Sequence, residues 1–472
     1  MRLTFMTTAL LLTASASLAQ TTNDPFPSPI ATTEGVIRVD FVEFASIPDV
    51  GGEVARMMLL VDEPGTGRIF VNDMRGPLYT VSYDGRTVVE YLNIDDANWE
   101  VGVQARSRER GFQSFAFHPQ FGQAGTAGYG KFYTWTDSRN TAPPPDFTPN
   151  GGGDTHDTVL FEWTARNPGG SSYDGGPPRE MLRIQQPYGN HNGGQIGFNP
   201  LASPGDTDFG LLYVSVADGG SGGDPLNHAQ NLASIFGKIL RIDPLGSNSG
   251  NGEYGIPSGN PFVGDAGALG EIYAYGVRNA QRLAWDAANG NMFLADIGQN
   301  IVEKISLVTA GANLGWNDWE GSFRFISRSE VSLADPRGDP TVTYPVAEYG
   351  QLDPLLQRQS AASGLLVYRD DAIPQLANLV LFGDMPSGEV FYVDADELPN
   401  GGQDAIRRIL FNDGGTAKTF LQLIQEKNAE QGRSPASRAD LRFGPGPDGR
   451  VLLLNKYDGT IRLLVPDGAG SR

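Results

Sequence analysis

Short apolar runs that alternate with polar residues dominate this sequence, and turn residues separate them. This pattern is typical of β-strands, whose side chains point alternately to the two faces of a sheet. The 61 glycines and 32 prolines are scattered among these runs, as expected of many strands joined by tight turns. Helical periodicity is scarce, with short candidates only at 418–425 and 227–232. We therefore predict an all-β protein.

One pair of strands recurs along the chain, with a turn containing Pro, Gly or Asp between its members. The six copies are 68–71 with 78–81, 114–119 with 131–136, 195–200 with 212–218, 282–286 with 291–296, 379–382 with 390–393, and 440–444 with 451–455. A β-sandwich or jelly roll would not be expected to repeat one hairpin six times. We predict a six-bladed β-propeller of four-stranded blades with long inter-strand loops, formed by residues 36–466 as a single domain.

The N-terminus has the order of a secretory signal peptide. Arg2 precedes the apolar run 9–12, and small residues follow up to Ala19. The apolar run is shorter than the roughly 18 residues that a membrane span needs. A buried N-terminal helix is the alternative. We expect an exported protein, periplasmic or secreted, with a signal peptide at 1–19, a flexible leader at 20–35 and a C-terminal tail at 467–472.

Charge and composition narrow the range of partners. The net charge of −20 argues against nucleic acid and anionic lipid, which both attract basic surfaces. The chain has 0 cysteines, so its stability rests on a core or bound ions instead of disulfides. It also lacks a His-Glu-x-x-His zinc motif and a Walker A loop. The abundant aspartates could supply oxygen ligands for calcium.

His191 is the most informative of the 4 histidines. It lies in the loop 190–194, which is rich in Gly and Asn and precedes a predicted inner strand, so its side chain could point into the propeller channel. A histidine placed there suits a general base near neutral pH. A turn histidine that caps a strand is the alternative. We expect His118 to be structural, and His156 and His228 to be surface or loop residues.

Two further segments could bind ligands. Arg278 and Asn279 follow the predicted strand 271–275 and could bind carboxylate or carbonyl oxygens, although an intramolecular salt bridge is an equal possibility. The turn 295–300 has free carbonyls and a flanking aspartate that could bind calcium, with a plain β-turn as the alternative.

Taken together, these segments resemble the glucose/sorbosone dehydrogenase family of soluble sugar dehydrogenases that depend on pyrroloquinoline quinone. The resemblance runs in collinear order over nearly the whole mature chain. It implies a six-bladed propeller that oxidises an aldose hemiacetal or related polyol to a lactone and passes the electrons to an external acceptor. The matching stretches are 109–119, 191–194, 218–220, 237–243, 276–279, 296–300, 311–316, 320–321, 381–384 and 387–388.

The resemblance also implies roles for single residues. His191 would take the hydroxyl proton, Asp218 would support it, and Arg278 would polarise the quinone oxygen. The backbone carbonyls of Gly298 and Gln299 would hold a calcium ion that binds the cofactor. Contacts to the cofactor would come from Glu109, Asn190, Asn279, Arg438 and Arg442.

The chain departs from the family pattern at several of these positions. Pro386 stands where the family has a cofactor-binding lysine, and Ile297 and Glu109 stand where it has glutamines. An Arg-x-Arg pair of the last blade falls on Ala439 and Leu441, beside Arg438 and Arg442. Family branches that share the turn include binding proteins that resemble hedgehog-interacting protein. The alternative function is therefore a non-catalytic, calcium-stabilised propeller that binds a glycan or a protein.

Overall fold

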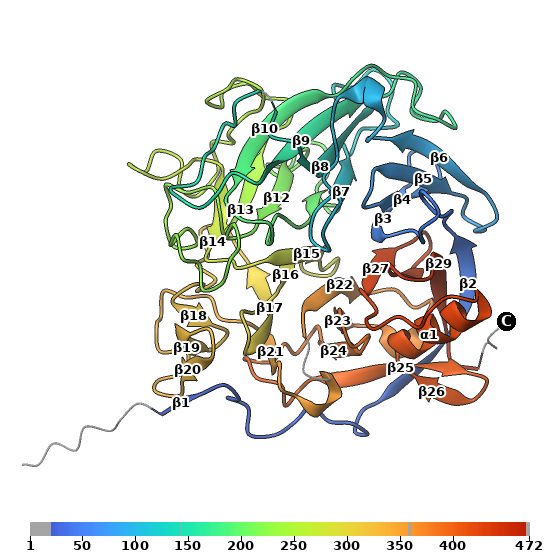
Figure 1. Ribbon diagram of the computed structural model, residues 1–472, viewed down its shortest axis with the longest axis vertical. Helices are drawn as coiled ribbons and strands as arrows, with labels where there is room; N and C mark the ends of the chain where they lie inside the picture. Colours follow the sequence, from blue (N-terminus) through green and yellow to red (C-terminus); the bar gives the residue numbers. More distant parts are fainter. Residues whose placement is uncertain (1–19, 142, 357–359, 469–472) are drawn as a thin grey trace, which may run out of the picture.

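Six four-stranded blades surround a central axis in the part of the chain that the structure describes (Figure 1). This computed structural model describes residues 20–141, 143–356 and 360–468. The predicted signal peptide 1–19 and the end of the predicted tail, 469–472, lie outside these residues. Inner strands of neighbouring blades contact one another around the ring. The contacts run from β3 through β7 to β11 and from β15 through β22 and β27 back to β3, and β12 of blade 3 contacts β15. The predicted all-β, six-bladed propeller is confirmed.

Each blade is an antiparallel sheet, and the first five are built from consecutive stretches of chain. Blade 1 comprises β3 (Met57–Glu63), β4 (Arg68–Asp73), β5 (Pro77–Val81) and β6 (Val88–Asn93). Blade 2 comprises β7 (Phe112–Phe117), β8 (Lys131–Ser138), β9 (His156–Thr164) and β10 (Arg179–Gln186). Blade 3 comprises β11 (Ile196–Phe198), β12 (Leu212–Val216), β13 (Lys238–Ile242) and β14 (Ile272–Tyr275).

The remaining three blades complete the ring. Blade 4 comprises β15 (Ala280–Trp285), β16 (Met292–Asp296), β17 (Val302–Val308) and β21 (Ala347–Gly350). Blade 5 comprises β22 (Ala362–Tyr368), β23 (Leu379–Asp384), β24 (Val390–Asp394) and β25 (Arg407–Asp413), with β26 (Thr416–Lys418) paired to β25. Blade 6 comprises β27 (Arg442–Pro445), β28 (Val451–Leu454), β29 (Thr460–Val465) and β2 (Ile37–Ser46).

The N-terminal strand β2 closes the ring. It pairs antiparallel with β29 near the end of the chain, so the first and last strands of the propeller lie side by side (Figure 1). It also pairs in parallel with β25, which joins blades 5 and 6 into one continuous sheet. Backbone hydrogen bonds between the two ends of the chain therefore hold the ring shut.

The apolar core lies between the blades. Each of the six main hydrophobic clusters among the described residues joins two neighbouring blades. Phe70 of blade 1, for example, packs against Phe117 of blade 2 with ring centroids 4.4 Å apart. Because the apolar side chains of the strands pack against the next blade, the polar side chains lie mainly along the axis and in the loops.

The six recurring hairpins fall one in each blade. Four of them form the first and second strands, whereas 68–71 with 78–81 and 379–382 with 390–393 form the second and third. These two copies therefore occupy a different position within their blades. The first strands of those blades, β3 and β22, read as nearly continuous apolar runs in place of an alternation.

Elements outside the ring are few among the described residues. A small sheet contains β1 (Thr21–Thr22), β18 (Trp319–Glu320), β19 (Phe323–Ser327) and β20 (Glu330–Ser332), and lies beside blade 4 (Figure 1). Short 3-10 turns occur at Ala97–Trp99, Pro354–Leu356 and Pro374–Leu376. Within the predicted leader 20–35, Thr21–Thr22 pairs with β20, and the Ile30 N–H donates to Asp353 at 2.7 Å.

One of the two predicted helices is present. Helix α1 (Phe420–Glu430) covers most of 418–425 and begins with a capping box between Thr419 and Gln422. The prediction of a helix at 227–232 is wrong, because that segment forms turns. The Asp224 carboxylate accepts the backbone N–H groups of His228 and Ala229 at 2.9 and 2.8 Å, which fixes the chain in that shape.

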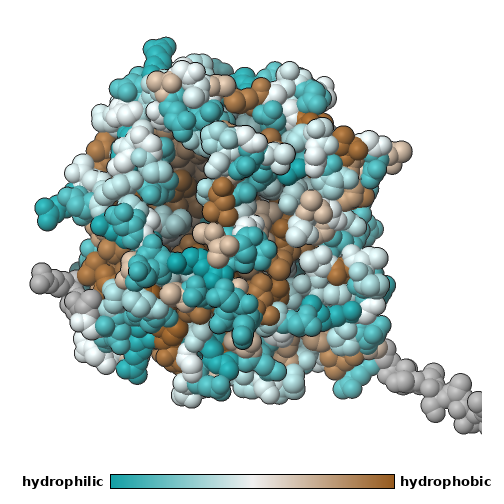
Figure 2. All heavy atoms as spheres, turned by 180° about the vertical axis from the view of Figure 1, so that it is seen from behind, coloured by the Kyte–Doolittle hydropathy of each residue, from teal (hydrophilic) through white to brown (hydrophobic). Residues whose placement is uncertain are grey.

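The face opposite to that of Figure 1 has a hollow in its upper half, and its apolar residues are scattered in small groups among hydrophilic ones (Figure 2). Among the described residues, the structure has no helix that is long and apolar enough to cross a membrane.

Candidate active site

A cavity of about 410 Å³ opens where loops from several blades meet, and it gathers most of the predicted site residues. The loops that line it precede the first strand of a blade or follow the second, so they all lie at one end of the ring. Asp218 lies behind His191, and Asn190 is outside the lining, where its side-chain oxygen accepts the Ser221 N–H at 3.1 Å. The predicted residues that line the cavity are Glu109, His191, Arg278, Asn279, Gly298, Gln299, Arg438 and Arg442.

His191 is held in an unusual backbone conformation at the cavity wall. Its φ of +55° lies in the left-handed region that residues other than glycine rarely adopt. Its backbone N–H donates to Glu109 Oε2 at 2.9 Å, which helps to hold this conformation. Gly193 also has a positive φ, and a Cβ there would collide with the Trp135 indole nitrogen. Strained backbone of this kind is concentrated at functional sites.

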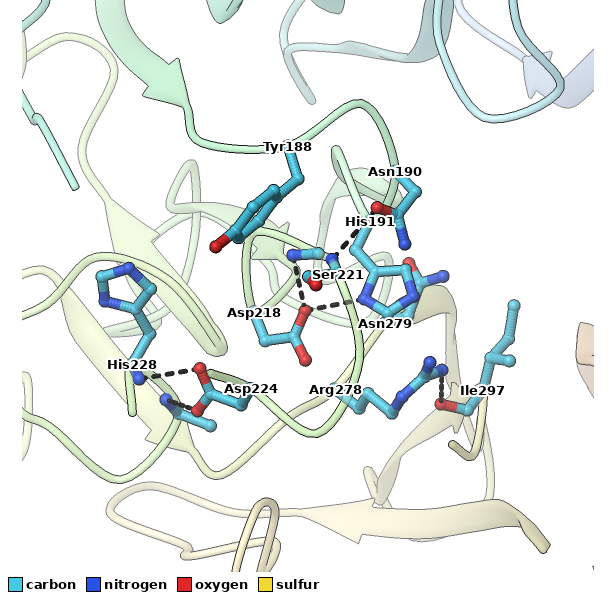
Figure 3. A network of polar contacts seen from close by, with 12 residues as sticks. Tyr188, Asn190, His191, Asp218, Ser221, Asp224, His228, Arg278, Asn279 and Ile297 are labelled. Carbon is cyan, nitrogen blue, oxygen red and sulfur yellow. Dashed lines mark hydrogen bonds and ion pairs between the residues drawn. The ribbon is translucent and has the colours of Figure 1, made fainter. Parts of the chain in front are cut away.

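The His191 side chain faces Asp218, as Figure 3 shows. Its Nδ1 lies 2.7 Å from Asp218 Oδ1, which also accepts the Gly220 N–H at 2.9 Å. The second carboxylate oxygen accepts the Trp316 indole N–H at 2.9 Å. Burial raises the pKa of Asp218, but His191 and Arg278 lower it more, so the pKa lies below its usual value. An ionised Asp218 holds the proton on Nδ1 and leaves Nε2 as the basic nitrogen of His191.

Arg278 links this pair to the predicted calcium turn. It is only 4% exposed, and its guanidinium lies 5.7 Å from the centre of the Trp316 ring. Its Nη1 donates to the backbone oxygens of Gly298 at 2.5 Å and Ile297 at 3.1 Å. The side chain is drawn toward Ile297 in Figure 3. The alternative of a salt bridge for Arg278 is not realised, because its partners are carbonyl oxygens.

Two buried carboxylates shape the turn from the inside. Glu320 Oε1 accepts four consecutive backbone N–H groups, those of residues 299–302, at distances of 2.7 to 3.1 Å. Glu303 Oε2 accepts the Gly298 N–H at 3.2 Å. Because these N–H groups point into the protein, the carbonyls of 297 and 298 are directed to Arg278. Glu320 was noticed in the sequence only as part of a family motif.

The last blade supplies a basic wall through alternating side chains. Arg438, Asp440 and Arg442 line the cavity, whereas Ala439 and Leu441 are fully buried in the apolar cluster between blades 5 and 6. The two positions that depart from the family pattern therefore face the core. Their cationic neighbours face the cavity.

Arg442 is the least satisfied of these cations. It is 1% exposed, and its Nη1 donates to the Leu441 carbonyl at 2.8 Å. Its Nε has no hydrogen-bond partner among the described residues. Burial lowers the pKa of Arg442 to about 10, although Asp440 raises it. A buried guanidinium with a free donor at a cavity wall is a preformed anion contact.

Sequence reasoning missed two basic residues of the cavity, Arg108 and Lys456. Lys456 is 5% exposed and donates to the Arg108 carbonyl at 3.2 Å. Burial lowers the pKa of Lys456 to about 7, against the opposing effect of Asp440. Lys456 comes directly after the sixth repeated hairpin. Ile297 comes directly after the fourth and also lines the cavity. This shared position in the repeat is the signal from which Lys456 could have been predicted to lie at the cavity end of the ring.

The cavity suits an anionic quinone. Pyrroloquinoline quinone is a tricarboxylate, and five basic side chains line the cavity against only two acidic ones, in a chain of net charge −20. Each charge-assisted hydrogen bond to such a ligand contributes about 1.5 to 3 kcal/mol. Pro386 also lines the cavity and contributes no charge there, but Arg108 and Lys456 supply cations from other loops. The residues present therefore fit this cofactor.

Calcium does not fit this arrangement of the turn. The Gly298 oxygen, one of its two predicted ligands, already accepts the Arg278 guanidinium at 2.5 Å. A calcium ion on the same oxygen would lie next to a fixed positive charge, and the two would repel. Among the described residues, no group of three or more acidic, histidine or cysteine side chains offers another metal site.

The other histidines lie away from the cavity lining. His118 is buried and its Nδ1 accepts the Gln120 N–H at 3.1 Å, consistent with the structural role predicted for it. The prediction of a surface or loop position is wrong for His156, which is 1% exposed and lies in a strand, whereas His228 lies in a loop as predicted but is only 2% exposed. His156 starts β9, where it packs 3.3 Å from Asp137, and His228 Nδ1 lies 2.8 Å from Ser234 Oγ.

Known proteins similar to this chain include plant and bacterial examples. The HIPL1 protein of Arabidopsis thaliana is 29% identical over 389 residues, which cover 74% of this chain and 53% of that protein. An aldose sugar dehydrogenase of Escherichia coli is 27% identical over 231 residues, which cover 48% of this chain and 53% of that protein. The chain thus spans about half the length of the curated relatives it matches.

A solved structure extends the comparison to the fold. The PQQ-bound form of the aldose sugar dehydrogenase from Streptomyces coelicolor superposes with a TM-score of 0.55 at 19% identity, over 90% of this chain and 96% of that one. Residues 57–413 match the family model described as Glucose / Sorbosone dehydrogenase. This match covers most of the chain and includes all the predicted site residues except Arg438 and Arg442. The chain belongs to the glucose/sorbosone dehydrogenase family.

Proposed function

We propose that this chain is an exported oxidoreductase that oxidises the hemiacetal of an aldose, or a related polyol, with pyrroloquinoline quinone as cofactor. The observation that carries the proposal is the His191–Asp218 pair at the wall of a cavity with an excess of basic side chains. A proton acceptor and an anion-binding wall around one space are what this chemistry requires.

His191 would act as the general base. With Nδ1 engaged by Asp218 at 2.7 Å, Nε2 makes no hydrogen bond to any described residue and is available to a substrate hydroxyl. Removal of the hydroxyl proton by Nε2 makes loss of hydride from the same carbon favourable, so that the C–O bond becomes the lactone carbonyl. Asp218 would stabilise the positive charge that develops on His191.

The basic side chains would bind and orient the cofactor, which when bound accepts the hydride from the sugar carbon. Arg442, Lys456 and Arg438 are placed to bind its carboxylates, because they line the cavity and one of their donors is unpaired. Arg278 and Asn279 line the same cavity on the His191 side and are suited to polarise a quinone oxygen there. Calcium is left out of the proposal because Arg278 occupies the turn.

The test is a titration of the purified protein with pyrroloquinoline quinone, followed by dye reduction with a panel of aldoses. We expect a shift in the cofactor's absorbance at micromolar concentrations, and sugar-dependent reduction of the dye. No binding at micromolar quinone would contradict the proposal.

One comparison favours a second function, that of a non-catalytic binding protein. The hedgehog-interacting protein of Mus musculus, whose name states an interaction, is 26% identical over 223 residues, which cover 47% of this chain and 29% of that protein. A binding propeller would keep the scaffold, and would show neither the absorbance shift nor dye reduction. The same titration therefore separates the two functions.

A further inference from the structure

A second, larger cavity adjoins the first. It measures about 690 Å³, and Arg108, Asp440 and Lys456 line both spaces. Ligand pockets are usually about 300 to 1,000 Å³, so the first cavity, at about 410 Å³, is near the lower end. A tricyclic cofactor placed there leaves little room for a sugar, which must then extend toward the second cavity.

The second cavity has the same sign of charge as the first. Its acidic lining residues are Glu53 and Asp440. Its basic lining residues are Arg56, Arg106, Arg108, Arg433 and Lys456. The chain as a whole has a net charge of −20, so this excess of basic side chains is local. It creates a positive electrostatic potential in the cavity, which attracts anions. The cofactor in the first cavity does not account for Arg56, Arg106 and Arg433, which line only the second.

Some of these cations have partners within the protein. Arg56 donates to the carbonyls of Ala105 and Ser107 at 2.9 and 2.6 Å, and thereby anchors the loop that carries the next arginines. Arg433 forms an ion pair with Asp49 at 2.7 Å. Both guanidiniums are therefore held by partners within the protein, although Arg433 Nη1 has no hydrogen-bond partner among the described residues.

Arg106 and Arg108 differ from them. Among the described residues, neither guanidinium forms a hydrogen bond or an ion pair, and both side chains are exposed at the edge of the cavity. They stand on the loop that Arg56 anchors. The fork of a single guanidinium matches a carboxylate, and here two guanidiniums with free donors stand on one anchored loop.

The same loop leads to the proposed base. Glu109 follows Arg108 and accepts the backbone N–H of His191 at 2.9 Å. A ligand with one end at His191 and the other at Arg106 would therefore lie along a single stretch of four residues. In the cyclic form of a hexuronate, the anomeric carbon and the carbon that bears the C6 carboxylate flank the ring oxygen. Such a sugar therefore carries one group for His191 and one for the arginines.

We propose that the second cavity selects an acidic sugar, a hexuronate or an oligosaccharide that carries one, by binding its carboxylate at Arg106 and Arg108. The inference rests on the proposed function, because it assumes that the hemiacetal end lies at His191. The carboxylate takes no part in the reaction. It gives up no electrons, and the hemiacetal is oxidised by the quinone as before. Basic Lys456, at the boundary of the two cavities, favours anions on both sides.

The test measures binding and so does not need turnover. D-Glucuronate and D-glucose are titrated calorimetrically into the full chain, with and without pyrroloquinoline quinone, at low and at 0.5 M salt. We expect glucuronate to bind at least 10-fold more tightly than glucose at low salt, with the preference reduced at high salt. Arg106→Glu should lower the glucuronate/glucose affinity ratio at least 10-fold. The control is Arg38→Glu, an exposed position on the outer strand β2, which should leave the ratio unchanged.

Each outcome decides one point. Equal affinity for the two sugars, or an equal effect of Arg106→Glu and Arg38→Glu on the ratio, would overturn the inference even if quinone binding and dye reduction succeed. A preference for glucuronate that Arg106→Glu abolishes, in a protein that does not bind the quinone, would support the acidic-sugar site and refute the proposed oxidation. Because the ratio is also measured without the quinone and always without an external electron acceptor, an effect of Arg106 on an anionic acceptor cannot produce it.

Discussion

The two sides of the first cavity differ in how far the protein satisfies its own polar groups. On the His191 side, both oxygens of Asp218 and both carbonyls next to Arg278 have donors within the chain. On the Arg442 side, the Nε of that residue has no acceptor among the described residues, and Lys456 has only a backbone carbonyl. On the first side, Asp218 and Arg278 are therefore held by the protein itself, and His191 Nε2 stays free for a substrate. On the second side, a cation keeps an unpaired donor.

This difference separates chemistry from binding. A general base must be held in one orientation before the substrate arrives, so its hydrogen bonds are made within the protein. An anion site gains affinity from donors that stay unpaired until the ligand arrives, at a cost to the stability of the empty protein. We therefore expect substitutions on the two sides to affect different measurements.

The largest effect is expected from His191→Ala. It should lower turnover about 10²- to 10⁴-fold, the usual contribution of a general base, and change quinone affinity less than threefold. Steady-state dye reduction measures the turnover, and absorbance titration measures the quinone affinity. His118→Gln, outside the cavity, is the matched control. A loss of quinone affinity equal to the loss of turnover would mean that the two sides are not separate.

Asp218→Asn keeps the shape of the side chain and removes its charge. We expect turnover to fall about 100-fold, because a developing positive charge on His191 is no longer stabilised and the Nδ1 proton is no longer fixed. The measurement is kcat at saturating quinone. If turnover is retained, the charge of Asp218 is not needed, and His191 acts as the base without its support.

Arg442→Met tests the other side. Quinone affinity should weaken about 10- to 100-fold, since a hydrogen bond to a charged group contributes about 1.5 to 3 kcal/mol. The free energy of unfolding of the empty protein should stay the same or rise, because a buried charge with an unpaired donor is removed. Denaturant unfolding and quinone titration on the same preparation give both values. A lower free energy of unfolding together with unchanged quinone affinity would contradict the prediction, because Arg442 would then serve stability and not binding.

Quinone affinity should also depend on pH through Lys456. Burial places its pKa at about 7 in the empty protein, and an anionic ligand stabilises the charged form, so binding takes up a proton above pH 7. Affinity is then highest below pH 7 and falls as the pH rises, by at most about tenfold per unit for one proton. Titrations from pH 6 to 9 measure this slope. In Lys456→Met the slope should be reduced, and an unchanged slope would assign it to another group.

The smallest effect is expected from calcium. Because Arg278 already occupies the Gly298 carbonyl, 5 mM calcium should change the melting temperature of the quinone-free protein by less than about 1 °C. Arg278→Ala frees the carbonyls, and the same calcium concentration should then stabilise the variant. Clear stabilisation of the unsubstituted protein by calcium would show that the ion displaces Arg278 from the Gly298 carbonyl.

Much of the molecule could be predicted from local pattern. Period-two alternation gave the strands, the six repeated hairpins gave the blade number, and the sequence at 418–425 gave the helix at Phe420–Glu430. These features depend on neighbours within a few residues. The helix predicted at 227–232 failed because a carboxylate outside the window, that of Asp224, holds the backbone in turns.

The candidate site was predictable only in part. His191 stood out by its loop, and its pairing with Asp218 came from resemblance, since 27 residues separate the two in the chain. Arg108 and Lys456 were missed because exposed and buried basic residues look alike in a sequence. The contact between them joins residues 348 positions apart.

The sequence by itself determined the all-β class, the six blades and the presence of a histidine suited to proton transfer, because each is encoded in a short stretch of chain. The tertiary structure alone decided that Ala439 and Leu441 face the core, that Arg278 occupies the calcium turn, and that a second basic cavity adjoins the first. The physical reason is ring closure. The ring brings loops from distant blades to one end, where burial and charge decide what each side chain can bind.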